Sequence, residues 1–128
     1  MIRTMPLQPI SLVSQVGAVT DLWSPRVVAE LNGQYLKVAK IKGEFVWHKH
    51  DAEDELFLVL RGSLRLQFEH EQVTLREGEC FVVPRGVLHN PVADEECWIA
   101  LFEPAATTHT GDVVTERTRS IAEQRAHL

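Results

Sequence analysis

The sequence lacks long apolar runs, basic clusters and helical periodicity. No stretch of its 128 residues approaches the ~20 apolar residues of a membrane-spanning helix. Residues 1–6 do not show the apolar core of a secretory signal. The net charge is −5 and no basic stripe stands out, which argues against nucleic acid because phosphate contacts dominate that affinity. We therefore expect a cytoplasmic protein with neither a membrane nor a nucleic-acid partner.

Cysteine is also scarce. Cys80 and Cys97 are the only two, they lack C-x-x-C spacing, and each lies in an apolar, strand-like segment. This pattern favours buried free thiols, and a disulfide between neighbouring strands is the open alternative. The chain is long enough for one compact core and too short for two ordinary domains. We expect residues 1–128 to form a single domain.

What the sequence does contain is a succession of short apolar or alternating segments separated by glycine or proline. Such segments about ten residues apart are typical of a β-sandwich or β-barrel. Asn32-Gly33 is a strong hairpin signal. Residues 1–24 are interpreted as an N-terminal extension, and 113–128 as a polar tail that is either a short frayed helix or a disordered end. The predicted strands are 27–31, 34–41, 44–50, 55–60, 64–69, 71–75, 80–83 and 96–102.

Three histidines and a glutamate are the candidate metal ligands of the chain. A strand over 44–50 would place His48 and His50 on one face, which is half of a metal site. Glu55, at the start of the next predicted strand, would be a third ligand, with Glu53 and Asp54 as alternative carboxylates. His89 is the fourth candidate. Each feature alone is weak, because surface histidines and acidic loops are common, but together they predict a metal site.

These residues resemble the two motifs of the cupin superfamily, over residues 43–93. The first motif is matched by Gly43, His48, His50, Glu55 and Gly62, and the second by Gly78, Pro84, Gly86 and His89. Two positions depart from the usual pattern. Four residues, where the pattern has five, separate Gly43 from His48, and Ala93 stands where the second motif usually closes with asparagine.

The resemblance implies an all-β, single-domain double-stranded β-helix, which is the jelly-roll or RmlC-like cupin barrel. The sequence looks like small stand-alone cupins described as mannose-6-phosphate-isomerase-like. It implies that His48, His50, Glu55 and His89 hold one divalent transition-metal ion. Three imidazoles and a carboxylate suit Fe, Mn, Ni, Zn, Co or Cu. On an octahedral ion they would leave two positions open for a ligand, so catalysis is chemically feasible.

Two classes of function are compatible with this site. The first is a metal-dependent enzyme that acts on a small polar molecule, by isomerase or lyase chemistry or by dioxygenase chemistry. The alternative is a non-catalytic small-ligand-binding or sensor cupin. It stays open because no further acid or base is evident, so no catalytic residue is assigned. A purely structural barrel is disfavoured because all four ligand types are present.

Strand alternation extends the prediction to the surroundings of the site. Val46, Phe57 and Val59 are expected on the face of the ligands, giving a mostly apolar pocket for molecules that bind through one or two oxygens. In 96–102 the alternation allows Trp98 and Phe102 to point either into the barrel or away from it.

The opposite face of the strand at 55–60 carries Leu56, Leu58 and Leu60, and a small barrel has only one interior. We therefore expect a homodimer that covers these leucines, with N-terminal residues crossing to the partner. The alternative is that the N-terminal segment of the same chain covers them. Trp47 is expected to point away from the metal, between the sheets or at the dimer contact.

Overall fold

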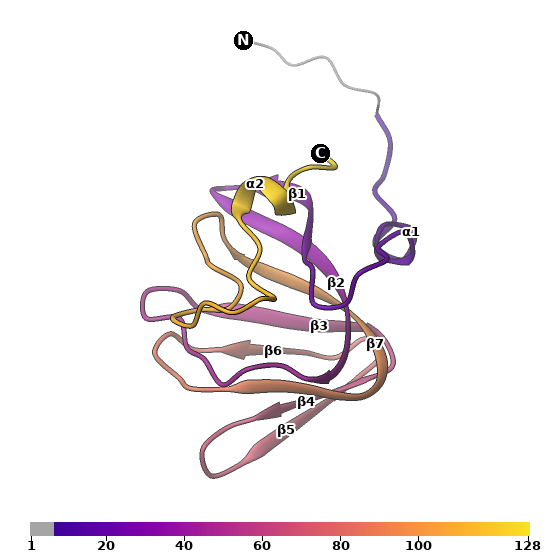
Figure 1. Ribbon diagram of the computed structural model, residues 1–128. Coiled ribbons are helices and arrows are strands. Elements are labelled where there is room, and N and C mark those ends of the chain that lie inside the picture. Colours follow the sequence, from indigo (N-terminus) through magenta and orange to yellow (C-terminus); the bar gives the residue numbers. More distant parts are fainter. Residues whose placement is uncertain (1–6) are drawn as a thin grey trace.

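The computed structural model describes residues 7–128, and the regular structure within this range consists mainly of antiparallel strands that curl into a jelly-roll barrel (Figure 1). The all-β prediction is confirmed. Residues 1–6 of the predicted N-terminal extension lie outside the described residues. The elements are α1 (Leu12–Gly17), β1 (Arg26–Leu31), β2 (Gln34–Glu44), β3 (Glu55–Arg61), β4 (Ser63–Gln67), β5 (Gln72–Arg76), β6 (Cys80–Val83), β7 (Asn90–Pro104) and α2 (Ile121–Gln124).

Strand β7 connects the parts of the barrel. One of its edges pairs with β2 along nearly its whole length, from Val92 to Pro104. Its other edge pairs first with β4 and then with β3, so the strand passes from one layer to the other. The sequence predicted only 96–102 as this strand. The observed strand begins at Asn90 because β4 and the end of β2 provide backbone partners for its first residues.

The turn at Asn32-Gly33 forms as predicted. Both residues have positive φ, 51° and 74°, as a two-residue hairpin of type I′ requires. The predicted strand over 44–50 is wrong. The register of β2 shifts between Ile41 and Gly43, where Gly43 has a φ of 81°, and regular pairing ends at Glu44. Beyond that point the chain is held by single contacts rather than by a ladder, and only one isolated bridge joins it to the segment before β7.

The barrel interior contains the predicted inward side chains of β3. Phe57 and Val59 are buried in the main apolar cluster. In β7 the buried residues of this cluster are Ala93, Cys97, Ile99 and Leu101. Because side chains alternate along a strand, Trp98 belongs to the outer face, where it packs against a second cluster.

That second cluster covers the outer face of the sheet with residues of the same chain. Val16 of α1 packs with Val28 of β1 and with Val38, and Leu58 and Leu60 lie against them, partly buried. The N-terminal segment therefore covers part of the leucine face, which was the alternative to coverage by a second protomer. Trp47 does not pack between the sheets, since its side chain is 42% exposed.

The two cysteines are both free thiols, but in different surroundings. Cys97 is buried, and burial raises the pKa of its thiol to about 12, so it behaves as an inert core residue. Cys80 is exposed, which contradicts the expectation that both are buried. It lies on β6, at the edge of the sheet, where one face of the strand is open to solvent.

The C-terminal residues fold back across one end of the barrel (Figure 1). Helix α2 begins with a capping box, in which the Ser120 hydroxyl accepts from the Glu123 amide at 3.1 Å and the Glu123 carboxylate accepts from the Ser120 amide at 3.0 Å. Gln124 is buried, and Arg125 donates to the Tyr35 hydroxyl at 2.8 Å. Of the two alternatives for the tail, the short helix is the one observed.

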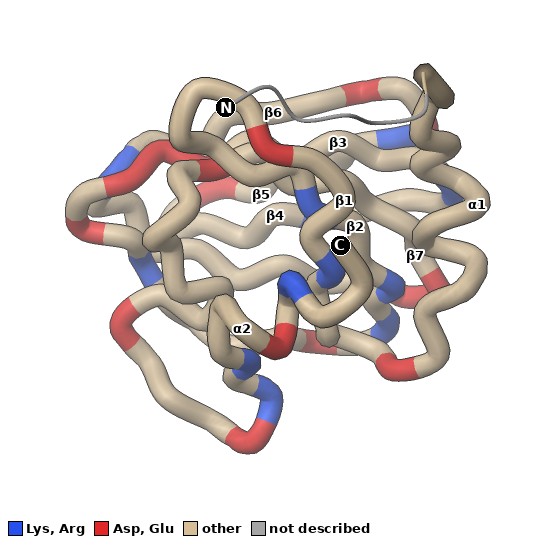
Figure 2. Tube along the Cα trace, turned by 90° about the horizontal axis from the view of Figure 1, so that it is seen from above, with Lys and Arg blue, Asp and Glu red and all other residues tan. Residues whose placement is uncertain are grey.

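Charged residues of both signs are interspersed around the barrel (Figure 2). In the part of the chain that the structure describes, no helix combines the length and the apolar character needed to cross a membrane.

Candidate metal centre

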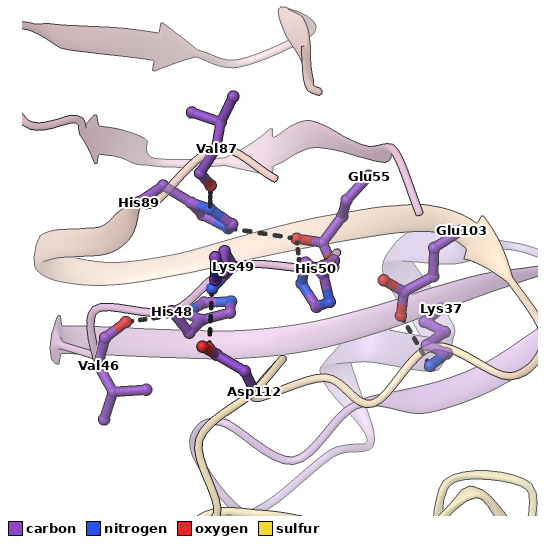
Figure 3. A network of polar contacts seen from close by, with 10 residues as sticks. All are labelled: Lys37, Val46, His48, Lys49, His50, Glu55, Val87, His89, Glu103 and Asp112. Carbon is purple, nitrogen blue, oxygen red and sulfur yellow. Dashed lines mark hydrogen bonds and ion pairs between the residues drawn. The ribbon is translucent and has the colours of Figure 1, made fainter. Parts of the chain in front are cut away.

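Four buried side chains converge inside the barrel (Figure 3). Glu55 opens β3, His48 and His50 come from the loop after β2, and His89 directly precedes β7. One ligand atom from each of the four lies within 4.8 Å of the others. The structure thus brings together all four residues that the sequence singled out.

Backbone contacts between two loops bring the histidines together. The amide and carbonyl of His48 exchange hydrogen bonds with those of His89, both at 2.9 Å. The Gly86 amide donates to the His50 carbonyl at 2.8 Å, and Gly86 has a φ of 77° that residues with a Cβ resist. These contacts align the two motif loops although neither forms a regular strand there.

Two of the imidazole rings have a fixed tautomer. Nδ1 of His48 lies 2.9 Å from the Val46 carbonyl, and Nδ1 of His89 lies 2.9 Å from the Val87 carbonyl. A carbonyl only accepts, so Nδ1 carries the proton and Nε2 presents its lone pair to the site. The Val46 side chain points away from the centre (Figure 3), contrary to the predicted alternation, and Phe45 contacts the His48 ring edge-on instead.

The lack of hydrogen-bond partners for the buried ligand atoms also indicates that this donor set fits a metal ion. Nε2 of His50 and Nε2 of His89 lie 3.5 and 3.7 Å from Oε1 of Glu55. All three atoms are buried and make no hydrogen bond within residues 7–128. A buried polar atom without a partner costs about 1–3 kcal/mol, and one cation between these atoms would satisfy all three. The alternative carboxylate Asp54 instead accepts from the Arg85 amide at 2.8 Å, away from the centre.

The ionisation states also suit metal ligands. Burial, followed by the charge of His89, lowers the pKa of His48 to about 4, so this ring is neutral. Burial opposes the charged form of His50, but the neighbouring Glu55 carboxylate outweighs that effect and raises the pKa of His50. Burial likewise opposes the charged form of Glu55, yet its interactions with Glu103 and with the neighbouring histidines hold the pKa of Glu55 well below its usual range. The neutral His48 ring and the ionised Glu55 carboxylate are therefore in the forms that bind a metal.

A buried ion pair next to Glu55 was not foreseen from the sequence. Nζ of Lys37 lies 2.7 Å from Oε1 of Glu103, and both side chains are fully buried (Figure 3). Burial and the neighbouring charge of Glu55 raise the pKa of Glu103. The signal was present in the alternation of β2, where Lys37 shares a face with the inward residues Ala39 and Ile41.

The C-terminal segment also contacts the ligand loop. The amide of Lys49 donates to Oδ1 of Asp112 at 3.2 Å, and the Asp112 amide donates to the Lys49 carbonyl at 3.2 Å. Gly111 sits directly over His48, with a φ of 62°. A Cβ at this position would collide with the Lys49 carbonyl and would lie 2.8 Å from Cδ2 of His48.

Gly111→Ala is therefore expected to weaken metal binding by about 10-fold or more while the barrel remains folded, because the displaced segment shifts the His48 ring. Competition with a chromogenic chelator measures this affinity. Gly78→Ala is the matched control, since Gly78 has a similar φ of 80° but open space around its Cβ. Equal metal affinity in the two variants would contradict the role of the Gly111 contact.

A small apolar cavity adjoins Glu55. Its volume is about 30 Å³, and its walls include Trp23, Ile41, Phe45, Phe57 and Leu101. This agrees with the predicted apolar character of the pocket. The sequence left open which face of 96–102 points inward. Trp98 belongs to the outer face, and Ile99 and Leu101 line the cavity. His109, from the segment between β7 and α2, also lines the cavity.

The unfolding free energy of the metal-free protein is expected to fall as the pH drops from about 6.5 to about 4. Burial, followed by the charge of Lys37, lowers the pKa of His109 to about 4. The unfolded chain therefore binds a proton in this window that the folded chain refuses. The stability due to the neutral ring is fully present above pH ~6.5 and is lost toward pH ~4, amounting to about 3 kcal/mol.

Chemical denaturation at pH ~7.5 and ~4.5 measures this change. From pH ~7.5 to pH ~4.5 the free energy of unfolding of His109→Phe should fall by about 3 kcal/mol less than that of the wild type. The exposed control His70→Phe should behave as the wild type. A His109→Phe variant with an unaltered pH dependence would contradict the buried neutral state.

Comparison with known proteins agrees with the fold. A family model described as a cupin domain matches residues 36–102. An uncharacterized protein, YdbB of Bacillus subtilis (strain 168), is 35% identical over 63 residues, or 48% of this chain, and the match spans 56% of YdbB.

Solved structures extend the similarity. A cupin-2 domain containing protein from Shewanella frigidimarina NCIMB 400 is 44% identical, with a TM-score of 0.73, over 74% of this chain and 93% of that one. The protein NMB1881 from Neisseria meningitidis is 28% identical, with a TM-score of 0.70, over 76% and 99% of the two chains. The family model covers half of this chain, and the match to the Shewanella protein covers 93% of that protein at 44% identity. The chain therefore belongs to the cupin family.

Proposed function

We propose that His48, His50, Glu55 and His89 hold one divalent transition-metal ion, and that the protein uses it to bind and convert a small molecule in the adjoining cavity. The observation that supports this most strongly is the set of buried ligand atoms, on three of these residues, that have no partner among residues 7–128. Fe, Mn, Ni, Zn, Co and Cu are the candidates. When bound, such an ion supplies a Lewis acid that can polarise a carbonyl oxygen.

The residues of the chain define what this site accepts. Aromatic and aliphatic walls exclude water and leave room only for a compact molecule. Glu55 is the ligand that borders the cavity, so a molecule there lies next to the centre. These walls favour a small carbonyl or carboxylate compound over a sugar phosphate, which would need polar partners for its hydroxyl and phosphate groups. Isomerase or lyase chemistry on such a compound is the favoured activity.

A non-catalytic ligand-binding or sensor cupin is the second candidate. The observation that favours it is the scarcity of acid–base groups at the cavity. Among the described residues, Glu55 and His109 are the titratable side chains that line it, and Glu55 is assigned to the metal. Binding without turnover requires no further group.

A turnover screen distinguishes the proposals. The protein is loaded with Zn or Ni and incubated with small keto acids, hydroxy acids and aldehydes without oxygen. Product formation supports isomerase or lyase chemistry. Product that forms only with Fe or Mn and with oxygen supports dioxygenase chemistry instead. Saturable binding with no product under either condition supports the sensor, and absence of both binding and product contradicts a small-molecule site.

We also propose a homodimer that uses the outer face of β3. Leu56 and Phe102 line a hollow there with Val82, whose side chain is 49% exposed. The N-terminal segment covers Leu58 and Leu60 but not this part of the face. Light scattering is expected to show a dimer at micromolar concentration, and Val82→Glu should shift it to the monomer. A wild-type monomer under these conditions would contradict the dimer.

A further inference from the structure

His109 is a buried histidine that belongs to neither motif and is not one of the four candidate ligands. It lies in the segment between β7 and α2, is 6% exposed, and forms part of the cavity wall together with Glu55 and Phe57. The long-range fold of the C-terminal residues, rather than a local pattern, brings it there. Its chemistry at the cavity follows from the partners of its two ring nitrogens.

One nitrogen of His109 is already committed. The backbone amide of Arg119 donates to Nε2 at 2.7 Å, so Nε2 must be unprotonated. In the neutral ring the proton then resides on Nδ1, which leaves this atom as the donor of the ring. Burial lowers the pKa of His109 to about 4, so the ring is neutral near pH ~7. His109 therefore offers one donor and no free acceptor.

Packing holds the His109 ring in place. The His109 ring stacks on Phe45, with centroids 6.1 Å apart and planes at 28°. Phe45 in turn stacks on Trp23 at 4.5 Å and meets the edge of His48 at 5.6 Å. The Arg117 guanidinium also lies over the Phe45 ring, and it donates to the Glu44 carbonyl at 2.7 Å. A ring held in this way loses little freedom when a ligand binds, which favours specificity.

We propose that His109 is a specificity-determining residue, whose Nδ1–H donates to an oxygen of a small carbonyl or carboxylate compound held in the cavity. The inference rests on the proposed metal site, which would hold a second oxygen of the same molecule. The apolar part of the ligand would pack against Phe57 and Leu101. The acceptor nitrogen of His109 is occupied by the Arg119 amide, so His109 itself can bind a ligand only as a donor.

The test uses pyruvate as the probe and cobalt as a visible reporter. Wild-type protein, His109→Phe, His109→Gln and the exposed-site control His70→Phe are each loaded with Co²⁺, and their cobalt content and circular dichroism are compared. Pyruvate is then titrated into each while the cobalt absorption is followed. His109→Phe is expected to weaken the pyruvate Kd about 10-fold, the effect of one lost hydrogen bond, at unchanged cobalt content. His109→Gln keeps a donor and should lose less.

The possible failures are distinguishable. A folded wild type that takes up no cobalt would overturn the metal site, and this inference with it. Cobalt binding without any pyruvate response, or with equal Kd in the wild type and His109→Phe, would overturn the role of His109 alone. Loss of cobalt in His109→Phe would also overturn it, because the residue would then support the metal ligands rather than the bound molecule.

Discussion

Replacing His48 and His50 together with alanine is expected to abolish metal uptake and leave a folded β-protein. The double variant removes two of the four side chains that converge at the centre. Loss of a residue that merely supports a ligand costs 10–100-fold in affinity, so loss of two ligands should exceed about 100-fold. The fold should persist because the contacts that align the loop, His48 with His89 and Gly86 with His50, use backbone atoms that alanine retains.

Metal content of the purified variant, with circular dichroism as the check on folding, measures this result. His70→Ala is the matched control, because His70 is exposed in the β4–β5 hairpin and is not one of the four candidate ligands. Metal content equal to that of the wild type in the double variant would contradict the assignment of these histidines.

The second large effect is expected at the buried pair beside Glu55. Lys37→Met removes one partner and leaves the Glu103 carboxyl group buried beside Glu55 without its counter-charge. Breaking a buried ion pair in this way typically costs about 3–5 kcal/mol, since the remaining group is neither solvated nor paired. The free energy of unfolding from urea titrations of the metal-loaded protein measures the loss.

A double-mutant cycle provides the control. Lys37→Met combined with Glu103→Leu removes both charges and should recover most of the stability, because an apolar pair can replace a buried ion pair at little cost. Asp94→Asn breaks the exposed pair of Asp94 with Arg65, which has a similar separation of 2.6 Å, and should cost no more than about 1 kcal/mol. A Lys37→Met variant as stable as Asp94→Asn would show that the buried pair does not behave as the structure indicates.

The metal ligands could be identified from the sequence because their spacing is local within each motif. The predicted reason for their convergence was incomplete, however. A strand over 44–50 would have aligned His48 and His50 by alternation, but Gly43 ends the regular pairing, and the bridge to His89 does the aligning instead. Alternation correctly placed Phe57 and Val59, which lie within an unbroken strand, and failed for Val46, which does not.

The polar groups around the centre could not be identified in the same way. Lys37 and Glu103 each look like an exposed charge on a strand until the pairing of β2 with β7 brings them together in the interior. His109 lies in a segment without periodicity, and its position depends on distant contacts such as those of Asp112 with Lys49. Such contacts are decided by the closed barrel as a whole, so no short sequence window contains them.

The proposed metal centre is tested most directly by the metal-to-protein ratio of the wild-type chain. Purified protein is incubated separately with each of the six candidate ions, dialysed to remove weakly bound metal, and analysed by elemental mass spectrometry. At least one ion should remain at one equivalent per chain, because the four ligand atoms meet in one buried cluster. A folded wild-type protein that retains none of the six would contradict the metal centre.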